Sequence, residues 1–154
     1  KDFETYGYVG DVVEVNAVFL ERLLAQHIVP VIAPIAVDKK GDSYNVNADT
    51  AAAAIAQGTG AEKLIFVTDV QGVMKGGKLL QSATSTEIED LIVKGIIYGG
   101  MIPKVKAAVA CLNKNLQNVM IADANQVMSD SGFTGTIIRH SREAGSYDST
   151  FSNI

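Results

Sequence analysis

The sequence has few of the residues from which metal and disulfide sites are built. It contains one cysteine, Cys111, and two histidines, His27 and His140, which are far apart in the chain. A single cysteine cannot form an internal disulfide, and isolated histidines do not supply the clustered ligands of a zinc site. We therefore predict no metal site. Cys111 lies in an apolar helical pattern and is expected to be a small core residue, as is common in a reducing compartment.

Long apolar runs and an excess of positive charge are also absent. No stretch of about 18 apolar residues could span a bilayer, and no N-terminal signal peptide is recognisable. The chain has 13 basic and 17 acidic residues, interspersed, with a net charge of −4. This balance gives no electrostatic footprint for nucleic acid. We predict a cytoplasmic protein with neither membrane nor nucleic-acid partners. Because no initiator methionine is present, we also expect a piece of a longer chain.

Several motifs that would identify an enzyme class are missing. There is no Walker A sequence and no glycine fingerprint of the dinucleotide-binding folds. A nucleophile elbow, which would indicate Ser-His-Asp catalysis, is also absent. Any nucleotide or phosphate site must therefore be built in another way.

The residues that are present favour one globular α/β domain. The 154 residues are 47% hydrophobic and 19% charged, which is enough apolar material for a real core. Short apolar runs and helical patterns alternate along the chain, and this alternation is typical of a three-layer αβα fold with a mostly parallel sheet. The runs that predict strands are 28–33, 63–68, 118–122 and 135–139, with an extended segment at 43–47 that returns from a turn at 38–42.

Four helices are predicted from caps and apolar spacing. The first follows Asn16 and closes near Gln26, and the second runs over 49–57. Thr84 and Glu87 form a capping-box pattern that opens the third, which ends at Lys94 and Gly95. The fourth begins after Gly99 and Gly100 and runs to about residue 113. Residues 140–154 are polar without a period, and we expect a mobile tail there.

The segment Asn45-Val46-Asn47-Ala48-Asp49 lies where a strand ends and an alanine-rich helix begins. Asn47 or Asp49 could simply cap that helix, because short polar side chains accept its unpaired N–H groups. However, one cap does not require three such groups. Asn45 and Asn47 are two apart on an extended segment and so project to one face. A functional cluster therefore remains an alternative to a cap.

Three loops are expected at the carboxyl edge of the sheet, where ligands of open α/β sheets collect. They are residues 45–49, 68–74 and 99–104. The last combines two glycines with a helix start, an arrangement that can bind anions. Lys104 is unfavourable for the dipole of that first turn, so a bound phosphate would explain it; a solvated surface lysine is the alternative. Asp69 could contact a ribose hydroxyl or a phosphate-bound magnesium ion.

Three motifs in this order resemble the acetylglutamate kinases of the amino acid kinase superfamily. They are Tyr44-Asn45-Val46-Asn47-Ala48-Asp49-Thr50-Ala51-Ala52, Phe66-Val67-Thr68-Asp69-Val70-Gln71-Gly72-Val73 and Gly99-Gly100-Met101-Ile102-Pro103-Lys104-Val105. The resemblance runs from about Tyr8 to Ile138. It implies a fold like that of carbamate kinase, and it implies phosphorylation of the side-chain carboxylate of N-acetyl-L-glutamate by ATP with Mg²⁺, a step of arginine biosynthesis.

The resemblance also implies residue roles. Asn45, with Asn47 beside it, would bind N-acetylglutamate. Asp49 would organise the catalytic lysines, and Lys104 would stabilise the transferring phosphoryl group. The nucleotide site would be lined by Thr68, Asp69, Val70, Gln71, Gly72, Val73, Met74, Ile96, Ile97 and Tyr98.

Two departures from the family pattern qualify these expectations. The family's amino-terminal half, with its glycine-rich phosphate loop, has no counterpart here. Residues 1–139 are therefore expected to be the carboxyl-terminal nucleotide-binding portion and to be inactive alone. The family forms dimers through its amino-terminal half, so a homo-oligomer is expected for the full-length protein. The segment between Asp123 and Gly135 is shorter than in arginine-inhibited members, so arginine feedback is not expected. An aspartate, glutamate 5- or uridylate kinase, or a non-catalytic nucleotide-binding module, remains an alternative.

Overall fold

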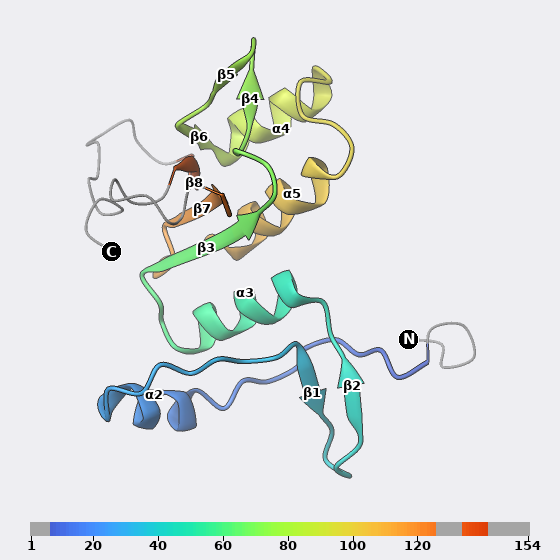
Figure 1. The fold of residues 1–154 in the computed structure, drawn as a ribbon, viewed down its shortest axis with the longest axis vertical. Coiled ribbons are helices and arrows are strands. Elements are labelled where there is room, and N and C mark those ends of the chain that lie inside the picture. Colours follow the sequence, from blue (N-terminus) through green and yellow to red (C-terminus); the bar gives the residue numbers. More distant parts are fainter. Residues whose placement is uncertain (1–6, 126–133, 142–154) are drawn as a thin grey trace. The chain divides into compact units, whose positions relative to one another are not determined.

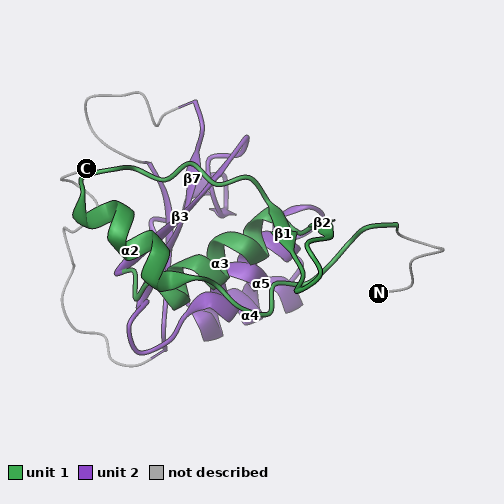
Figure 2. Ribbon diagram, turned by 90° about the horizontal axis from the view of Figure 1, so that it is seen from below, with its two compact units in different colours: residues 1–61 green, residues 62–154 purple. Residues whose placement is uncertain are grey.

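The chain divides into two compact units, Lys1–Ala61 (unit 1) and Glu62–Ile154 (unit 2) (Figures 1 and 2). The computed structural model describes residues 7–125 and 134–141. Most of the predicted tail, from residue 142 onward, lies outside the described residues, as does most of the segment between Asp123 and Gly135. The two units are described in turn.

Unit 1 contains two capped helices and a hairpin. Its elements are α2 (Ala17–Ala25), β1 (Ile35–Val37), β2 (Ser43–Asn45) and α3 (Ala48–Gly58). The Asn16 side chain accepts a hydrogen bond from the Phe19 N–H at 3.1 Å, so the predicted cap of α2 is confirmed. His27 follows this helix with a φ of 60°, as expected of a helix-end residue. Strands β1 and β2 pair antiparallel, which confirms the predicted hairpin.

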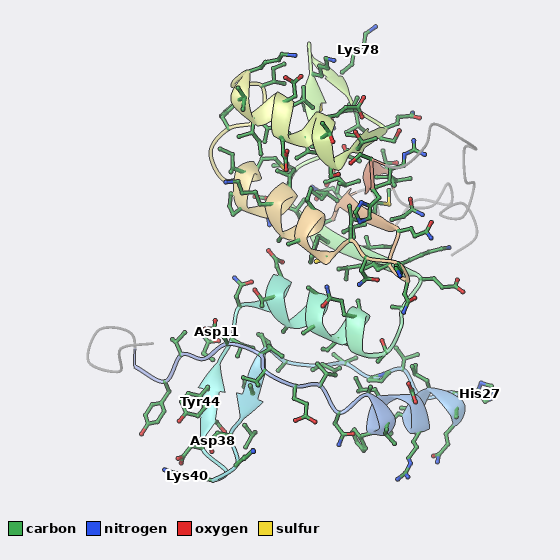
Figure 3. The ribbon with its side chains drawn as sticks, turned by 180° about the vertical axis from the view of Figure 1, so that it is seen from behind. Asp11, His27, Asp38, Lys40, Tyr44 and Lys78 are labelled. Atoms are coloured by element: carbon green, nitrogen blue, oxygen red, sulfur yellow. The ribbon has the colours of Figure 1, made fainter. Side chains whose placement is uncertain are left out.

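The turn of this hairpin is closed by one carboxylate. Asp38 accepts hydrogen bonds from the backbone N–H groups of Lys40 at 2.7 Å and Asp42 at 3.0 Å. The Tyr44 hydroxyl also donates to it, at 3.4 Å. Asp38 and Lys40 lie at the turn of the hairpin, and Tyr44 lies on β2 (Figure 3). Because Asp38 accepts hydrogen bonds from the backbone of its own turn, the turn is stabilised by local residues alone.

The predicted buried strand over 28–33 is wrong. Residues 28–34 form no strand, and Val29 and Val31 are 82% and 97% exposed. A buried parallel strand needs a hydrogen-bonded neighbour on each side, and within the described residues none pairs with this run. Pro30 and Pro34 also remove two backbone donors. An apolar run alone could not show whether partner strands exist.

Unit 2 is built around a four-stranded sheet with the order β3-β7-β8-β6. Its strands are β3 (Lys63–Thr68), β7 (Asn118–Asp123), β8 (Gly135–Arg139) and β6 (Ser82–Thr84). The β3–β7 and β6–β8 pairs are parallel, and the β7–β8 pair is antiparallel. The predicted α/β class and the mainly parallel sheet are confirmed, as are the strands expected at 63–68, 118–122 and 135–139.

Two helices pack against this sheet and against each other. Helix α5 (Met101–Cys111) lies on β7 and β8, and α4 (Ser85–Val93) lies on β6 (Figure 1). The fully buried side chains of the described residues all belong to unit 2, and the largest of them are Ile88, Leu116, Ile121 and Ile138. Cys111 is also in this core, as expected. Within the described ranges, no helix has the length and apolar character needed to cross a bilayer.

The sequence did not predict three short strands of unit 2. Strands β4 (Met74–Lys75) and β5 (Lys78–Leu79) pair as a hairpin around Gly76 and Gly77. These glycines have φ values of 58° and 76°, which fits the two-residue turn that matches strand twist. Strand β6 follows at once. Segments of two or three residues are too short to show an alternating pattern.

The capping box of α4 gives a pH-dependent prediction. The Thr84 N–H donates to the Glu87 carboxylate at 2.7 Å, and the Thr84 hydroxyl donates to the same oxygen; these bonds hold the Glu87 pKa below its ordinary value of 4.5. A lowered folded pKa contributes stability that is fully present above the unfolded pKa and is lost as pH falls through the folded pKa. Glu87→Gln should therefore lower the free energy of unfolding at pH 7 by less than about 1 kcal/mol.

Urea unfolding from pH 7 down to pH 3 measures this effect. The difference between wild type and Glu87→Gln should shrink as the pH falls below 4.5, because protonation of Glu87 removes the charge that distinguishes the two side chains. Glu89→Gln is the matched control, because Glu89 lies on the same helix outside the capping box. A difference for Glu87→Gln that stays constant down to pH 3 would contradict the assignment.

Candidate functional site

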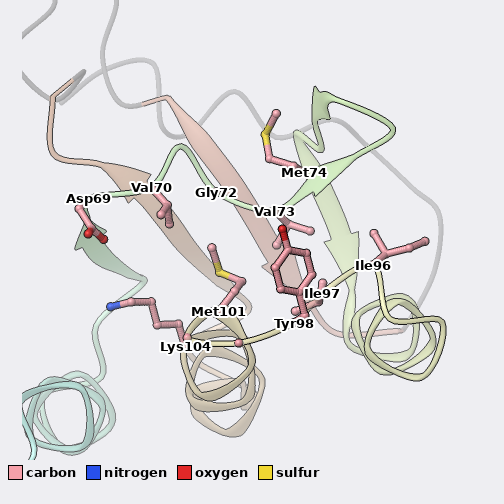
Figure 4. Close-up of a pocket in the computed structure, with 12 residues that line it drawn as sticks. Asp69, Val70, Gly72, Val73, Met74, Ile96, Ile97, Tyr98, Met101 and Lys104 are labelled. Atoms are coloured by element: carbon pink, nitrogen blue, oxygen red, sulfur yellow. The ribbon is translucent and has the colours of Figure 1, made fainter.

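A pocket of about 450 Å³ opens in unit 2 where the end of β3 faces the start of α5 (Figure 4). Apolar side chains form most of its lining, which also contains one carboxylate and one lysine. Its lining residues are Asp69, Val70, Gly72, Val73, Met74, Ile96, Ile97, Tyr98, Gly99, Gly100, Met101 and Lys104.

The first wall of the pocket is the loop that leaves β3. Thr68, the last residue of the strand, is buried and donates its hydroxyl to the Asp69 carboxylate at 3.1 Å. Asp69 itself is exposed at the rim. Three residues after Asp69, Gly72 has a φ of 126°, and a Cβ there would lie 2.7 Å from the Thr136 hydroxyl oxygen. Only glycine fits this position without displacing a neighbour.

The second wall is the connection between α4 and α5. The N–H groups of Ile96 and Ile97 both donate to the Leu91 carbonyl, at 3.0 and 3.1 Å, which satisfies the end of α4. Ile97 is buried, whereas Tyr98 is 76% exposed beside the opening. Gly99 has a φ of 56°, so the chain turns sharply before α5 begins.

The floor of the pocket carries its positive charge. Helix α5 begins at Met101, its N-cap Gly100 makes no side-chain hydrogen bond, and its first turn contains no acidic residue. Lys104 is half-buried and extends from this turn along the pocket, on the side where Asp69 lies (Figure 4). The N–H groups of Met101 and Ile102 donate to the carbonyls of Tyr98 and Gly99, at 3.3 and 3.2 Å, and Pro103 has no N–H. Attraction for an anion here therefore comes from the Lys104 ammonium group and the dipole of the helix start.

Most of the predicted nucleotide-site residues line this one pocket. Thr68 and Gln71 do not: Thr68 is buried with its hydroxyl bonded to Asp69, and Gln71 is exposed and does not line the pocket. Gly99, Gly100 and Met101 line the pocket but were not among the predicted site residues. The signal for them was available, because the glycine pair before a helix already indicated an anion site.

The Asn45, Asn47 and Asp49 cluster belongs to unit 1. Asn47 is the N-cap of α3, and its side-chain oxygen accepts hydrogen bonds from the Thr50 N–H at 3.0 Å and the Thr50 hydroxyl at 3.2 Å. The capping alternative is therefore correct for Asn47. Asp49 is half-buried in the first turn, where a carboxylate is favourable.

Asn45 is the last residue of β2, and its backbone is fixed on both sides. Its N–H donates to the Tyr8 carbonyl at 2.8 Å, and its carbonyl accepts from the Gly10 N–H at 2.9 Å. Its side chain is exposed. The functional roles of Asn45, Asn47 and Asp49 remain predictions.

The pocket suits a ligand with a flat apolar part and an anionic part. Aliphatic and aromatic side chains on two facing walls can hold a ring, and the lysine with the helix start can hold negative charge. A model of the amino acid kinase family matches residues 1–123, which is most of the chain.

The chain belongs to the amino acid kinase family.

Among its relatives in that family are several acetylglutamate kinases. The chain is 48% identical over 147 residues to the acetylglutamate kinase of Geobacillus sp. (strain WCH70), covering 95% of this chain and 56% of that protein. It is 48% identical over 135 residues to that of Halalkalibacterium halodurans, covering 86% of this chain and 52% of that protein. The chain thus spans about half the length of these relatives.

Solved structures show a similar fold. Smu.665 from Streptococcus mutans UA159 is 37% identical with a TM-score of 0.73, covering 90% of this chain and 54% of that one. Carbamate kinase from Giardia lamblia bound to citric acid has a TM-score of 0.62 at 22% identity, over 82% of this chain and 44% of that one. At that identity the likeness concerns the fold alone, and it agrees with the expected carbamate kinase-like architecture.

Proposed function

We propose that this chain is the nucleotide-binding portion of an acetylglutamate kinase, which transfers a phosphoryl group from ATP to the side-chain carboxylate of N-acetyl-L-glutamate. The observation that carries the proposal is the pocket of unit 2. It joins an apolar cleft to a lysine at a helix start, as a nucleotide with its phosphates would require. The identity of the acceptor, N-acetyl-L-glutamate, is inferred from the relatives, which are named acetylglutamate kinases.

In this proposal the adenine ring lies between the two apolar walls. Val73, Ile97 and Met101 supply apolar surface on both sides of the pocket. The phosphates point toward the start of α5, where Lys104 offers its ammonium group. Asp69, on the side of the pocket toward which Lys104 extends, contacts a ribose hydroxyl or the Mg²⁺ that accompanies ATP as part of the co-substrate.

The reaction needs little covalent help from the protein. A carboxylate oxygen of N-acetylglutamate attacks the γ-phosphorus, and the bond to the β,γ-bridging oxygen breaks, so that ADP leaves with the electron pair. Positioning and charge stabilisation therefore dominate. We assign charge stabilisation to Lys104, its orientation to Asp49, and acceptor binding to Asn45 with Asn47 beside it. Because Asn47 caps α3 through its oxygen, only its amide nitrogen would serve the acceptor.

We further propose that the chain alone binds nucleotide but does not turn it over. The family's glycine-rich phosphate loop has no counterpart in these 154 residues, and the relatives are nearly twice as long. Residues 1–139 would be the functional portion and 140–154 an appended tail. A cytoplasmic location and a homo-oligomeric full-length protein belong to the same proposal.

Replacing Asn45 by alanine tests the acceptor assignment. The substitution would be made in a full-length kinase in which this chain takes the place of the matching part of the Geobacillus relative. The KM for N-acetylglutamate should rise about tenfold with the KM for ATP nearly unchanged, because one hydrogen bond to a charged group is lost. Steady-state kinetics with each substrate varied in turn measures both constants.

Ser43→Ala is the matched control, since Ser43 lies two residues earlier on β2 and projects to the same side of the strand. A change confined to ATP would contradict the role of Asn45. The same protein should be offered aspartate, glutamate and UMP as acceptors. Faster phosphorylation of one of these would replace acetylglutamate kinase by another member of the family.

A further inference from the structure

The hairpin beside the pocket is held by a side chain from a different strand. In a hairpin with a two-residue turn, Val73 and Leu80 form the pair that follows Met74 and Leu79, and such a pair is expected to exchange two backbone hydrogen bonds. Only one is direct, from the Leu80 N–H to the Val73 carbonyl at 2.8 Å. The other is replaced by the hydroxyl of Thr136, a residue of β8.

The Thr136 hydroxyl fills this position by acting as acceptor and donor at once. It accepts from the Val73 N–H at 2.9 Å and donates to the Leu80 carbonyl at 2.6 Å. Thr136 is completely buried, so water is not at hand to replace the bonds. Among residues of this size, only a hydroxyl side chain can do both.

Neighbouring residues are fitted to this hydroxyl. The absence of a side chain at Gly72 leaves room for it, because a Cβ there would lie 2.7 Å from the oxygen. The next link along the strand is a backbone bond from the Ile137 N–H to the Gln81 carbonyl at 2.9 Å, after which β6 and β8 pair. The hydroxyl is thus the point at which the hairpin is attached to the sheet.

The attached segment forms a wall of the pocket. Gly72, Val73 and Met74 line it where the loop after β3 enters the hairpin (Figure 4), whereas Thr136 does not line it. We propose that Thr136 is a positioning residue, whose hydroxyl fixes the Val73–Leu80 base of the hairpin and thereby the shape of the wall that receives the nucleotide. This inference rests on the proposed nucleotide site.

The test compares Thr136→Val with Thr136→Ser in the 154-residue chain, with MgATP as the probe. Valine keeps the shape but removes the hydroxyl, whereas serine keeps the hydroxyl. The Kd for MgATP, measured by calorimetry, should rise about tenfold in Thr136→Val and stay within about twofold of wild type in Thr136→Ser. Ser82→Ala is the matched control: it loses a bond to Arg139 in the neighbouring strand and should leave the Kd unchanged.

Amide hydrogen exchange separates positioning from general stability. In Thr136→Val the Val73 amide should exchange at least about tenfold faster, while the amide of Val119, in the centre of the sheet, keeps its protection. Unchanged Val73 exchange or an unchanged Kd in the folded Thr136→Val variant would overturn the proposal. If Thr136→Val does not fold, Thr136→Ala takes its place, because it also removes the hydroxyl, and the same increases in Kd and in Val73 exchange are expected.

The two proposals can fail separately. If the folded wild-type chain does not bind MgATP, the proposed function is wrong. The exchange of Val73 in Thr136→Val and Thr136→Ser then still decides whether the hydroxyl fixes the hairpin. If wild type binds and all variants bind equally, the nucleotide site stands and the positioning role of Thr136 is overturned.

Discussion

Replacing Lys104 by alanine should lower kcat by about 100-fold or more, with a much smaller effect on the KM for N-acetylglutamate. The setting is the full-length chimeric kinase described for Asn45. The reason is that Lys104 lies in the pocket at the start of α5, where its charge is most needed as negative charge spreads over the transferring phosphoryl group. Steady-state kinetics with saturating MgATP measures the split.

Lys106→Ala is the matched control for this prediction. Lys106 lies on the same helix two residues later, is exposed, and does not line the pocket. Its removal changes the net charge by the same amount, so any general electrostatic effect appears in both variants. Equal losses of kcat in the two variants, or a Lys104→Ala defect that lies wholly in KM, would contradict the role of Lys104.

Among the glycines that the structure describes, Gly135 should be the one whose replacement by alanine is most destabilising, lowering the free energy of unfolding by about 3 kcal/mol. Gly135 is the first residue of β8 and is opposite Ala122 of β7. A Cβ there would lie 2.0 Å from the Ile121 carbonyl oxygen and 2.9 Å from the Ala122 Cα. These are backbone atoms of a central strand, so the steric clash can be relieved only if β7 and β8 move apart.

Urea unfolding of the 154-residue chain measures this loss. Gly100→Ala is the control, because nothing lies within 4 Å of a Cβ at that position, and its free energy of unfolding should change by less than about 1 kcal/mol. If Gly135→Ala costs no more than Gly100→Ala, the close contact between β7 and β8 is not as described.

The comparison of sequence with structure shows which signals carried information about the fold. Residues 63–68 and 118–122 were recognisable as strands because each is a short apolar run followed by a polar residue, and both are parallel strands in the sheet. The apolar run at 28–33 carried the same signal and forms no strand. The difference is that 63–68 and 118–122 have neighbouring strands with which to form hydrogen bonds. The sequence of a single segment does not show whether such neighbours exist.

The site was partly predictable for a similar reason. The rule that ligands collect at the carboxyl ends of strands located the loop after β3, and the glycine pair located the start of α5; both line the pocket. The role of Thr136 could not be found in this way. It depends on a hydroxyl from β8 entering a hairpin 56 residues away in sequence, and no local pattern encodes that contact.

Calorimetric titration of the 154-residue chain with MgATP tests the central claim most directly, followed by N-acetylglutamate in the same cell. The account predicts that MgATP binds to the wild-type chain and binds more weakly to Lys104→Ala, while Lys106→Ala behaves as wild type. It also predicts no phosphoryl transfer by the chain alone. Absence of MgATP binding to a chain whose Val119 amide is protected from exchange would contradict the assignment of the pocket as a nucleotide site.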